Sequence, residues 1–423
     1  MPREGKMLIP SIFRTTKAPS TGTNFPFSVR WWSPYPGTLN WGTMPANKNP
    51  IIWILLLVCS SCIDPFEPVI NESQEVMVID GMVSDRPGYY EVRVSTSSPY
   101  NNPGFQPVDG CVVTLEDGQG NIRFYDMAGQ GKYRAWLEPP FLATGKVYAV
   151  EVTTQNGTVY RSEYDTLLAC PPIDSLYYFE QTSGGTDPND IWNGIQFYND
   201  VRGGVVGTRN YRWRATATWE YHAPYTAQYI WHNGGSVPNI VDSVHACYLT
   251  ETIETVYAAS TQLLTENNIF QNKLHYVSDQ TPSLSERYSL LLEQHSLTDQ
   301  AFTYWEKIAA QSASGASLYE TQPASGQGNI YRVNSDAKVL GCFYATQIQE
   351  ERIFVDKHDL DFAAPAYTCR LDTLNDNSTF LFDKYYYLIS LQPLGPGPAW
   401  LGGLDKCFNC TLQGGVNEIP DFW

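Results

Sequence analysis

The sequence predicts a mainly β protein, with an N-terminal immunoglobulin-like or transthyretin-like β-sandwich followed by a larger β-rich domain that carries one amphipathic helix. Three observations support this fold class. Aromatic residues make up 14% of the chain, and aromatic and β-branched residues favour strands. Between residues 75 and 169, short alternating segments recur roughly every ten residues, with turn residues between them. One later segment repeats apolar residues at the helical interval.

The N-terminal sandwich is expected over residues 75–169. Residues 90–94 alternate with period two, and Asn156-Gly157 is typical of a hairpin turn. About seven strands in ~95 residues are typical of an immunoglobulin-like sandwich. Residues 107–162 also resemble the small transthyretin-like modules attached to outer-membrane receptors and carboxypeptidases.

The larger β-rich domain is expected over residues 173–423, after a joint that Pro171 and Pro172 stiffen. Residues 211–220 alternate as a long strand. Residues 222–282 are less regular, so we interpret them as a decorated insertion, and the domain ends in a cysteine-containing tail.

The expected helix begins near Ser296, which has Asp299 at the spacing of a capping box. Gly315 is available as its stop. Further strands on both sides predict a helix that lies on a sheet. The apolar residues at helical spacing are Leu297, Ala301, Tyr304, Trp305 and Ile308.

Residues 44–61 have the organisation of a secretory signal peptide. The apolar run Ile51–Val58 is too short to span a bilayer, which needs roughly 20 residues, and Lys48 precedes it. The cysteine behind this run resembles a bacterial lipobox, so Cys62 is expected to be lipidated and to become the mature N-terminus. Residues 1–43 lack this organisation and are expected to be a spurious extension.

Cys62 is preferred over Cys59 as the lipidation site because serines precede it, whereas Val58 before Cys59 is bulkier than signal peptidases favour. A cleaved signal without lipid is the alternative. Residues 62–74 would form the tether, and its early acidic residues resemble the surface-export signal of Bacteroidota lipoproteins. We therefore expect a lipid-anchored protein of the outer membrane that faces the cell exterior.

The charge of the chain excludes one class of partner. From Cys62 onward it holds 21 basic and 43 acidic residues, a net charge of −22. Such a body is not expected to bind nucleic acid, or an anionic lipid surface, through electrostatics.

Cys407 and Cys410 form a Cys-x-x-Cys motif between two glycine pairs, which indicates a loop. Disulfides are the preferred interpretation because they are permitted outside the cytoplasm. Cys247 and Cys369 are the preferred partners. A zinc site that includes Cys369 and His358, a redox pair and free thiols are the alternatives.

The remaining candidate sites are weaker. Aromatic residues crowd residues 192–232, so a sugar- or peptide-binding platform is one interpretation and a hydrophobic core the other. The histidines at 222, 232 and 245 suit a metal or a ligand, or lie exposed in loops. Calcium could bind the acidic stretches 359–361 and 372–377, where solvated turns are the alternative. The tryptophans of the candidate platform are Trp192, Trp213, Trp219 and Trp231.

Several short segments are informative only in combination. They are Val78-Ile79-Asp80-Gly81, Pro171-Pro172-Ile173-Asp174, Gly328-Asn329-Ile330, Val339-Leu340-Gly341 and the ending from Cys407 to Trp423. Together they resemble Bacteroidota lipoproteins of the family called domain of unknown function 4249. The resemblance extends essentially from Cys62 to Trp423. It implies an outer-membrane lipoprotein, often encoded near TonB-dependent transporters, and supplies no catalytic residues.

The sequence therefore predicts a non-enzymatic surface lipoprotein that assists a TonB-dependent barrel, by capturing a small-molecule, glycan or peptide ligand. No Gly-x-Ser-x-Gly motif occurs, so no catalytic residue is named, and no cofactor is expected besides the lipid on Cys62. An adhesion or envelope-structural module is the second hypothesis. A surface glycan or peptide hydrolase is the third.

Overall fold

The computed structural model describes residues 75–98, 105–184, 191–205, 207–232, 234–239, 244–314, 326, 328–374, 384–391 and 399–423. These residues form five β-sheets and one α-helix, α2 (Asp299–Ser314), and they belong to one structural unit that begins at Ile70. The prediction of a mainly β protein with one helix is confirmed. Within this described part of the chain, no helix combines the length and the apolar composition needed to cross a membrane.

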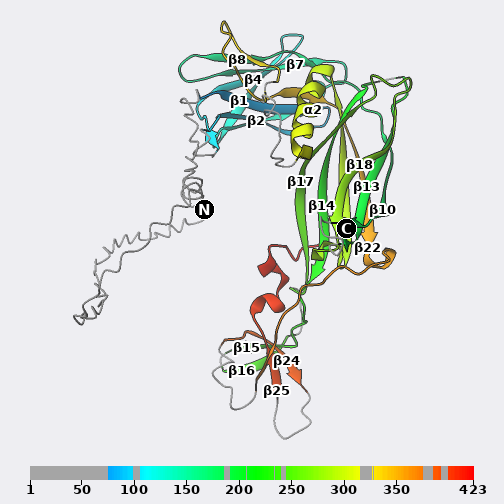
Figure 1. Ribbon diagram of the computed structural model, residues 1–423. Helices are drawn as coiled ribbons and strands as arrows, with labels where there is room; N and C mark the ends of the chain where they lie inside the picture. The colour runs from blue at the N-terminus through cyan, green and yellow to red at the C-terminus, as the bar shows by residue number, and fades with distance from the viewer. Residues whose placement is uncertain are drawn as a thin grey trace, which may run out of the picture. The chain divides into compact units, whose positions relative to one another are not determined.

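The first sheet curls around a single core, so that it nearly closes on itself (Figure 1). Its order is β20-β8-β7-β4-β5-β6-β2-β1-β21, with β3 beside β2 and β9 beside β7. Side chains from both halves of the sheet, such as Ile79, Val113 and Tyr148, form one hydrophobic cluster. Its assignment as immunoglobulin-like or transthyretin-like stays a prediction. The strands are β1 (Met77–Ser84), β2 (Gly88–Thr96), β3 (Gln106–Pro107), β4 (Val112–Asp117), β5 (Ile122–Gly129), β6 (Lys132–Leu137), β7 (Val147–Thr153), β8 (Val159–Ser162), β9 (Asp165–Thr166), β20 (Ile330–Arg332) and β21 (Phe343–Thr346).

Residues 328–346, here called the closing segment, add a strand to each end of this sheet. β20 pairs with β8, and β21 pairs in parallel with β1 from Gly81↔Phe343 onward. The buried amide of Asn329 ties these two strands together. It donates to the carbonyl of Phe343 (2.7 Å) and accepts from the N–H of Phe343 (3.0 Å). The sequence placed the closing segment in the larger domain, whereas its strands complete the first sheet; the wider division near residues 169–173 stays a prediction.

Gly341 permits the close approach of the closing segment to β1. Its φ is +95°, and a Cβ at this position would overlap the carbonyl oxygen of Ile79. The N–H of Ile79 bonds to the carbonyl of Leu340 (3.0 Å), directly beside the glycine. Only glycine combines this backbone conformation with the available space.

Two further sheets pack around a second core. One has the order β17-β14-β19-β22 and the other β10-β13-β18. Phe197 of β13, Trp213 of β14 and Leu290 of β19 belong to the same hydrophobic cluster. The strands are β10 (Ile173–Glu180), β13 (Gly194–Arg202), β14 (Asn210–His222), β17 (Ala246–Ser260), β18 (Asn268–Ser278), β19 (Arg287–Leu297) and β22 (Ile348–Asp356), with the short pair β11 (Ser183–Gly184) and β12 (Ile191–Trp192) and the 3-10 turns η1 (Pro282–Leu284) and η2 (Lys357–Asp359).

The interpretation of residues 222–282 as an irregular insertion is wrong for much of its length. β17 and β18 are two of the longer strands in the structure. β17 is an edge strand, and most of its residues from 249 to 256 are exposed or half-buried. Because it carries threonine and glutamate on both faces, it lacks the apolar alternation by which strands are recognised.

Strands of the tail form a small sheet with residues 229–232 and 235–238, and one of two disulfides, Cys247–Cys410, holds the tail to β17. The structure joins Cys247 to Cys410 and Cys369 to Cys407, so disulfides form and involve the four cysteines that the sequence singled out. The sheet has the order β16-β15-β24-β25-β23. Its elements are β15 (Tyr229–His232), β16 (Gly235–Pro238), β23 (Asp372–Leu374), β24 (Tyr387–Leu391) and β25 (Ala399–Gly402), followed by the turns η4 (Asp405–Cys407) and η5 (Cys410–Gln413).

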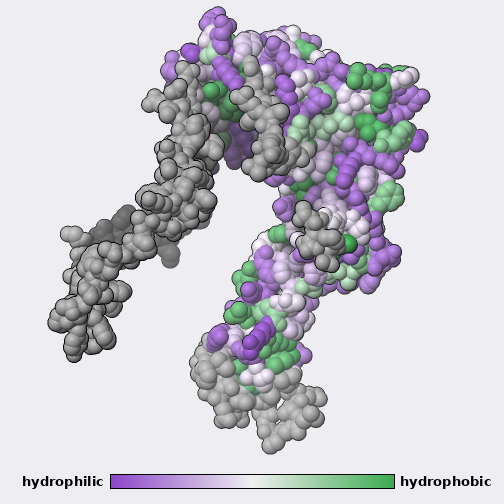
Figure 2. Space-filling view, viewed as in Figure 1, coloured by the Kyte–Doolittle hydropathy of each residue, from purple (hydrophilic) through white to green (hydrophobic). Residues whose placement is uncertain are grey.

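The visible surface of the described residues is largely hydrophilic, with separate hydrophobic patches (Figure 2).

Helix α2 begins two residues later than a cap at Ser296 implies. Ser296 lies in β19, where its hydroxyl donates to the carbonyl of Leu168 (2.7 Å). Thr298 takes the capping role, since its hydroxyl accepts from the N–H of Ala301 (3.3 Å). The predicted apolar face is confirmed, because Ala301 is buried and Trp305 packs beside it.

Asp165 connects the cap of α2 to the closing segment. This residue is 1% exposed; its carboxylate accepts from the N–H of Ala345 (2.8 Å) and from the hydroxyl of Thr298. Burial raises the pKa of Asp165 to about 6, although both hydrogen bonds oppose the shift. The folded protein therefore holds this proton more tightly than the unfolded chain does.

The account of Gly341 predicts that Gly341→Ala destabilises the protein by about 3 kcal/mol or more, because strain and overlap with β1 add together. Gly120→Ala is the matched control. Gly120 has a φ of +86° and nothing within 4 Å of a Cβ, so Gly120→Ala should lower the free energy of unfolding by only about 1 kcal/mol. Denaturant unfolding measures both, and equal losses would contradict the claim that close approach to β1 requires glycine.

The buried carboxyl of Asp165 predicts a specific pH dependence. Its contribution to stability is present below pH about 4 and is lost as the pH rises through about 6, by up to about 3 kcal/mol. The free energy of unfolding of Asp165→Asn, relative to the wild type, should therefore rise by that amount between pH 4 and pH 7. Asp336→Asn, at an exposed position, controls for the loss of a charge. Parallel pH profiles for wild type and Asp165→Asn would rule out the shift.

Candidate functional site

A cleft of about 650 Å³ lies where five separate segments of the chain meet. β1 and β2 contribute one wall, β14 and β17 a second, α2 a third, and the start of β21 the rest. In Figure 1, α2 stands between the labelled strands β1 and β2 and the strand β17. The closing segment therefore brings together walls that are far apart in sequence.

A β-bulge shapes the wall formed by β14 and β17. The register passes from Trp213↔Tyr257 to Ala215↔Ile253, so three residues of β17 stand opposite Arg214 alone. These residues, 254–256, line the cleft. Bulges are common beside functional sites because they redirect side chains at a sheet edge.

Alternation along β14 gives its two faces different roles. Tyr211 and Trp213 are buried in the second core, whereas Arg212 and Arg214 line the cleft. Successive side chains of a strand point to opposite faces. One strand thus contributes both a hydrophobic core and a pair of cations.

Arg212 is the central residue of the cleft. It is only 9% exposed, and its guanidinium carbon lies 3.5 Å from the ring centroid of Trp305. One Nη donates to the hydroxyl of Tyr344 (2.6 Å), while Nε has no hydrogen-bond partner in the described part of the protein. Burial lowers the pKa of Arg212. This is a desolvated cation held by aromatic side chains.

The other two arginines of the cleft have carboxylate partners. Arg214 lies 3.9 Å from Glu293, and Arg93 lies 2.7 Å from Glu91. Glu91 also contacts Arg134 at 2.7 Å. Among the described residues, by contrast, no carboxylate lies within 4 Å of the Arg212 guanidinium.

Further polar atoms near Arg212 lack partners. The Nε1 of Trp305 and both ring nitrogens of His295 are buried without hydrogen bonds in the described structure. His295 is the direct cross-strand neighbour of Arg212. Buried polar groups are normally satisfied, so this concentration of unpaired groups sets the region apart from an ordinary core.

Burial disfavours the charged forms of three ionisable side chains in the cleft. Burial raises the pKa of the Cys342 thiol and of the Tyr304 hydroxyl. Burial also raises the pKa of Asp80, against the lowering effect of the Cys342 N–H and of Arg93. A protonated thiol is a poor nucleophile, so the arrangement suits binding better than covalent chemistry.

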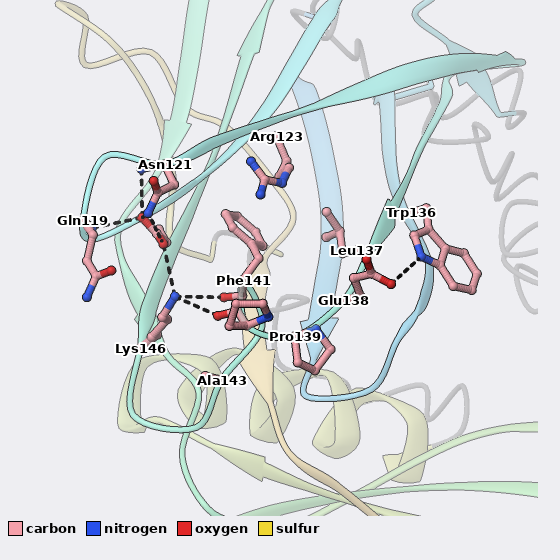
Figure 3. Close-up of a pocket in the computed structure, with 12 residues that line it drawn as sticks. Gln119, Asn121, Arg123, Trp136, Leu137, Glu138, Pro139, Phe141, Ala143 and Lys146 are labelled. Carbon is pink, nitrogen blue, oxygen red and sulfur yellow. Dashed lines mark hydrogen bonds and ion pairs between the residues drawn. The ribbon is translucent and has the colours of Figure 1, made fainter.

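A second cavity, of about 670 Å³, lies on the first sheet (Figure 3). Lys146 contacts Asp117 (3.3 Å) and donates to the carbonyl of Pro140 (3.0 Å), as the dashed lines show. Arg123 lies 4.7 Å from the ring centroid of Phe141. Lys146 already neutralises the buried Asp117, so this cavity has fewer unpaired charged groups for a ligand than the cleft has.

Comparison with protein families matches residues 63–352 to the family described as domain of unknown function (DUF4249). The chain belongs to this family. A comparison with curated proteins found no match.

The DUF4249 match includes every strand that lines the cleft, together with α2 and the closing segment. It ends within β22, before Cys369, Cys407 and Cys410. The expected likeness up to Trp423 is therefore longer than the range that is matched, and the disulfide-bonded tail lies outside it.

The four tryptophans of the expected platform do not form one surface in this DUF4249 protein. Trp213 is fully buried and donates to Gln294 (3.0 Å). Trp219 is half-buried and stacks on Tyr288, Trp231 packs in the small tail sheet, and Trp192 lies in β12. The aromatic crowding mainly fills cores, which is the alternative the sequence left open.

The other predicted site residues are dispersed. Cys62 lies outside the described residues. His222 and His245 come together, with ring centroids 5.0 Å apart, and His222 bonds to Glu220 (2.8 Å). In the described ranges no group of three or more His, Cys, Asp or Glu side chains forms a metal site. Asp356 and Asp359 cap η2, and part of the 372–377 stretch lies outside the described residues.

Sequence reasoning did not single out Arg212 or Tyr344, and it treated Trp305 only as part of a helix face. The available signal was the run Tyr211-Arg212-Trp213-Arg214, in which a strand with a buried face carries two arginines on the other. What the sequence does not contain is the register that brings β21 and α2 over that second face.

Proposed function

We propose that this DUF4249 protein is a non-enzymatic lipoprotein, anchored through Cys62 in the outer membrane and facing the cell exterior. In this proposal it captures a small ligand for a TonB-dependent barrel. Adhesion and hydrolysis would not require the buried cation found in the cleft.

The observation that carries the proposal is the cleft around Arg212. Its volume of about 650 Å³ is within the range of small-molecule sites, which are roughly 300–1,000 Å³. Its lining combines aromatic surfaces, such as Trp305 and Tyr89, with six charged residues. Aromatic surfaces with converging polar groups are typical of ligand pockets, and this lining is more charged than most, which favours a polar ligand.

The anchor and the charge support the same proposal. The lipobox-like Cys62 directly follows the signal at residues 44–61, and a body with a net charge of −22 is expected to stay soluble beside an anionic surface. Lipid attachment of this kind holds a binding protein beside the membrane, where its effective concentration at a transporter is high.

The anchoring proposal predicts that Cys62→Ser abolishes lipid attachment and leaves an unprocessed precursor. Cys59→Ser is the matched control and should be processed like the wild type. Mass spectrometry of the N-terminal peptide measures both variants. A lipidated Cys62→Ser protein, or lipid on Cys59, would contradict the assignment.

The transport proposal predicts that a C-terminally tagged chain, extracted in mild detergent from its native host, copurifies with a TonB-dependent barrel. The untagged strain is the control for adventitious binding. If the lipoprotein instead elutes alone at several detergent concentrations, and its deletion leaves uptake unchanged, the transport role is refuted.

A further inference from the structure

We propose that the cleft binds a ligand through a carboxylate group, with the Arg212 guanidinium as its buried anchor. The inference rests on the proposed function only in placing the ligand in this cleft. It is independent of whether a transporter receives that ligand.

Arg212 is a buried cation, and among the described residues no carboxylate within 4 Å balances its charge. Removing a cation from water is strongly unfavourable unless an anion or several hydrogen bonds replace the lost hydration. The chain supplies one bond to Tyr344 and the face of Trp305. A cation–π contact contributes about 2 kcal/mol or more when desolvated, which is less than the several kcal/mol that burying the ion costs.

Two contacts hold the guanidinium of Arg212. Its carbon lies 3.5 Å from the ring centroid of Trp305, and one Nη donates to the hydroxyl of Tyr344. The Nε of Arg212 and the Nε1 of Trp305 both lack a partner among the described residues. A carboxylate or a phosphate accepts two parallel bonds from a guanidinium, so the geometry indicates an anion, and the charges of the cleft distinguish the two.

The arginines of the cleft differ in their ion pairs. Arg93 is paired with Glu91 and Arg214 lies near Glu293, whereas Arg212 has no carboxylate within 4 Å among the described residues. Asp80 and Glu254 also line the cleft. A phosphate dianion would meet these two acids with its second charge, whereas a single carboxylate needs only Arg212 as its partner. The acids can accept hydrogen bonds from hydroxyl or ammonium groups of the same ligand.

Sugar acids and amino acids or peptides share this combination of one carboxylate with hydrogen-bond donors. Glucuronate represents the first source, with glucuronamide as its neutral partner. N-Acetylphenylalanine represents the second, with N-acetylphenylalaninamide beside it. Inorganic phosphate tests the competing anion chemistry.

The test is calorimetric titration of the purified chain with these probes. In at least one pair the acid should bind at least tenfold more tightly than the amide, and phosphate should not compete. Arg212→Met should remove the preference for the acid, and Arg212→Lys should reduce it about tenfold, because lysine keeps the charge without the planar fork. Arg202→Met, which removes a mainly exposed partner of Asp174, should bind like the wild type.

Three results would overturn the inference: equal binding of acid and amide in both pairs, an acid preference that survives in Arg212→Met, or Arg212-dependent binding of phosphate alone. If Arg212→Met does not fold, the acid preference of the wild type and its reduction in Arg212→Lys decide the question. Acid binding without a copurifying barrel would support the inference and refute only the transport role. If a barrel copurifies but the acids bind no more tightly than the amides, the transport role is supported and the inference is refuted.

Discussion

The parallel pairing of β21 with β1 is the contact on which the rest of the structure depends. It joins residues 81–84 to residues 343–346, which follow α2 and every strand of the second core except β22 in the sequence. Gly341 permits the approach, and Asn329 ties β20 to β21. Because Asp165 bonds to both the cap of α2 and the N–H of Ala345, the helix is held in the same arrangement.

This contact explains the unusual environment of Arg212. In an isolated sheet the second face of β14 would be solvated, and an arginine there would need no explanation. With β21 and α2 in place, Tyr344 and Trp305 enclose the side chain. Contacts between segments that are far apart in the sequence therefore remove Arg212 from water. We propose that a ligand carboxylate, rather than a carboxylate of the chain, balances its charge.

Local patterns predicted the local parts of this structure. The aromatic and alternating segments indicated strands, the spacing from Ala301 to Trp305 indicated a buried helix face, and the cysteine positions indicated disulfides. β17 was missed because an edge strand with threonine and glutamate on both faces has no apolar period. The closing segment was placed in the larger domain, although its strands complete the first sheet. Its pairing spans 262 residues, from Gly81 to Phe343, and no local signal encodes such a register. The cleft could not be predicted for the same reason, since its walls come from five separate segments.

The most direct measurement is a high-resolution crystal structure of the protein purified from its native membrane. The account predicts electron density for a carboxylate-bearing molecule in the cleft, with its oxygens within about 3 Å of the Arg212 guanidinium nitrogens. An ion pair between Arg212 and a carboxylate of the chain itself, such as Asp80 or Glu254, would contradict it.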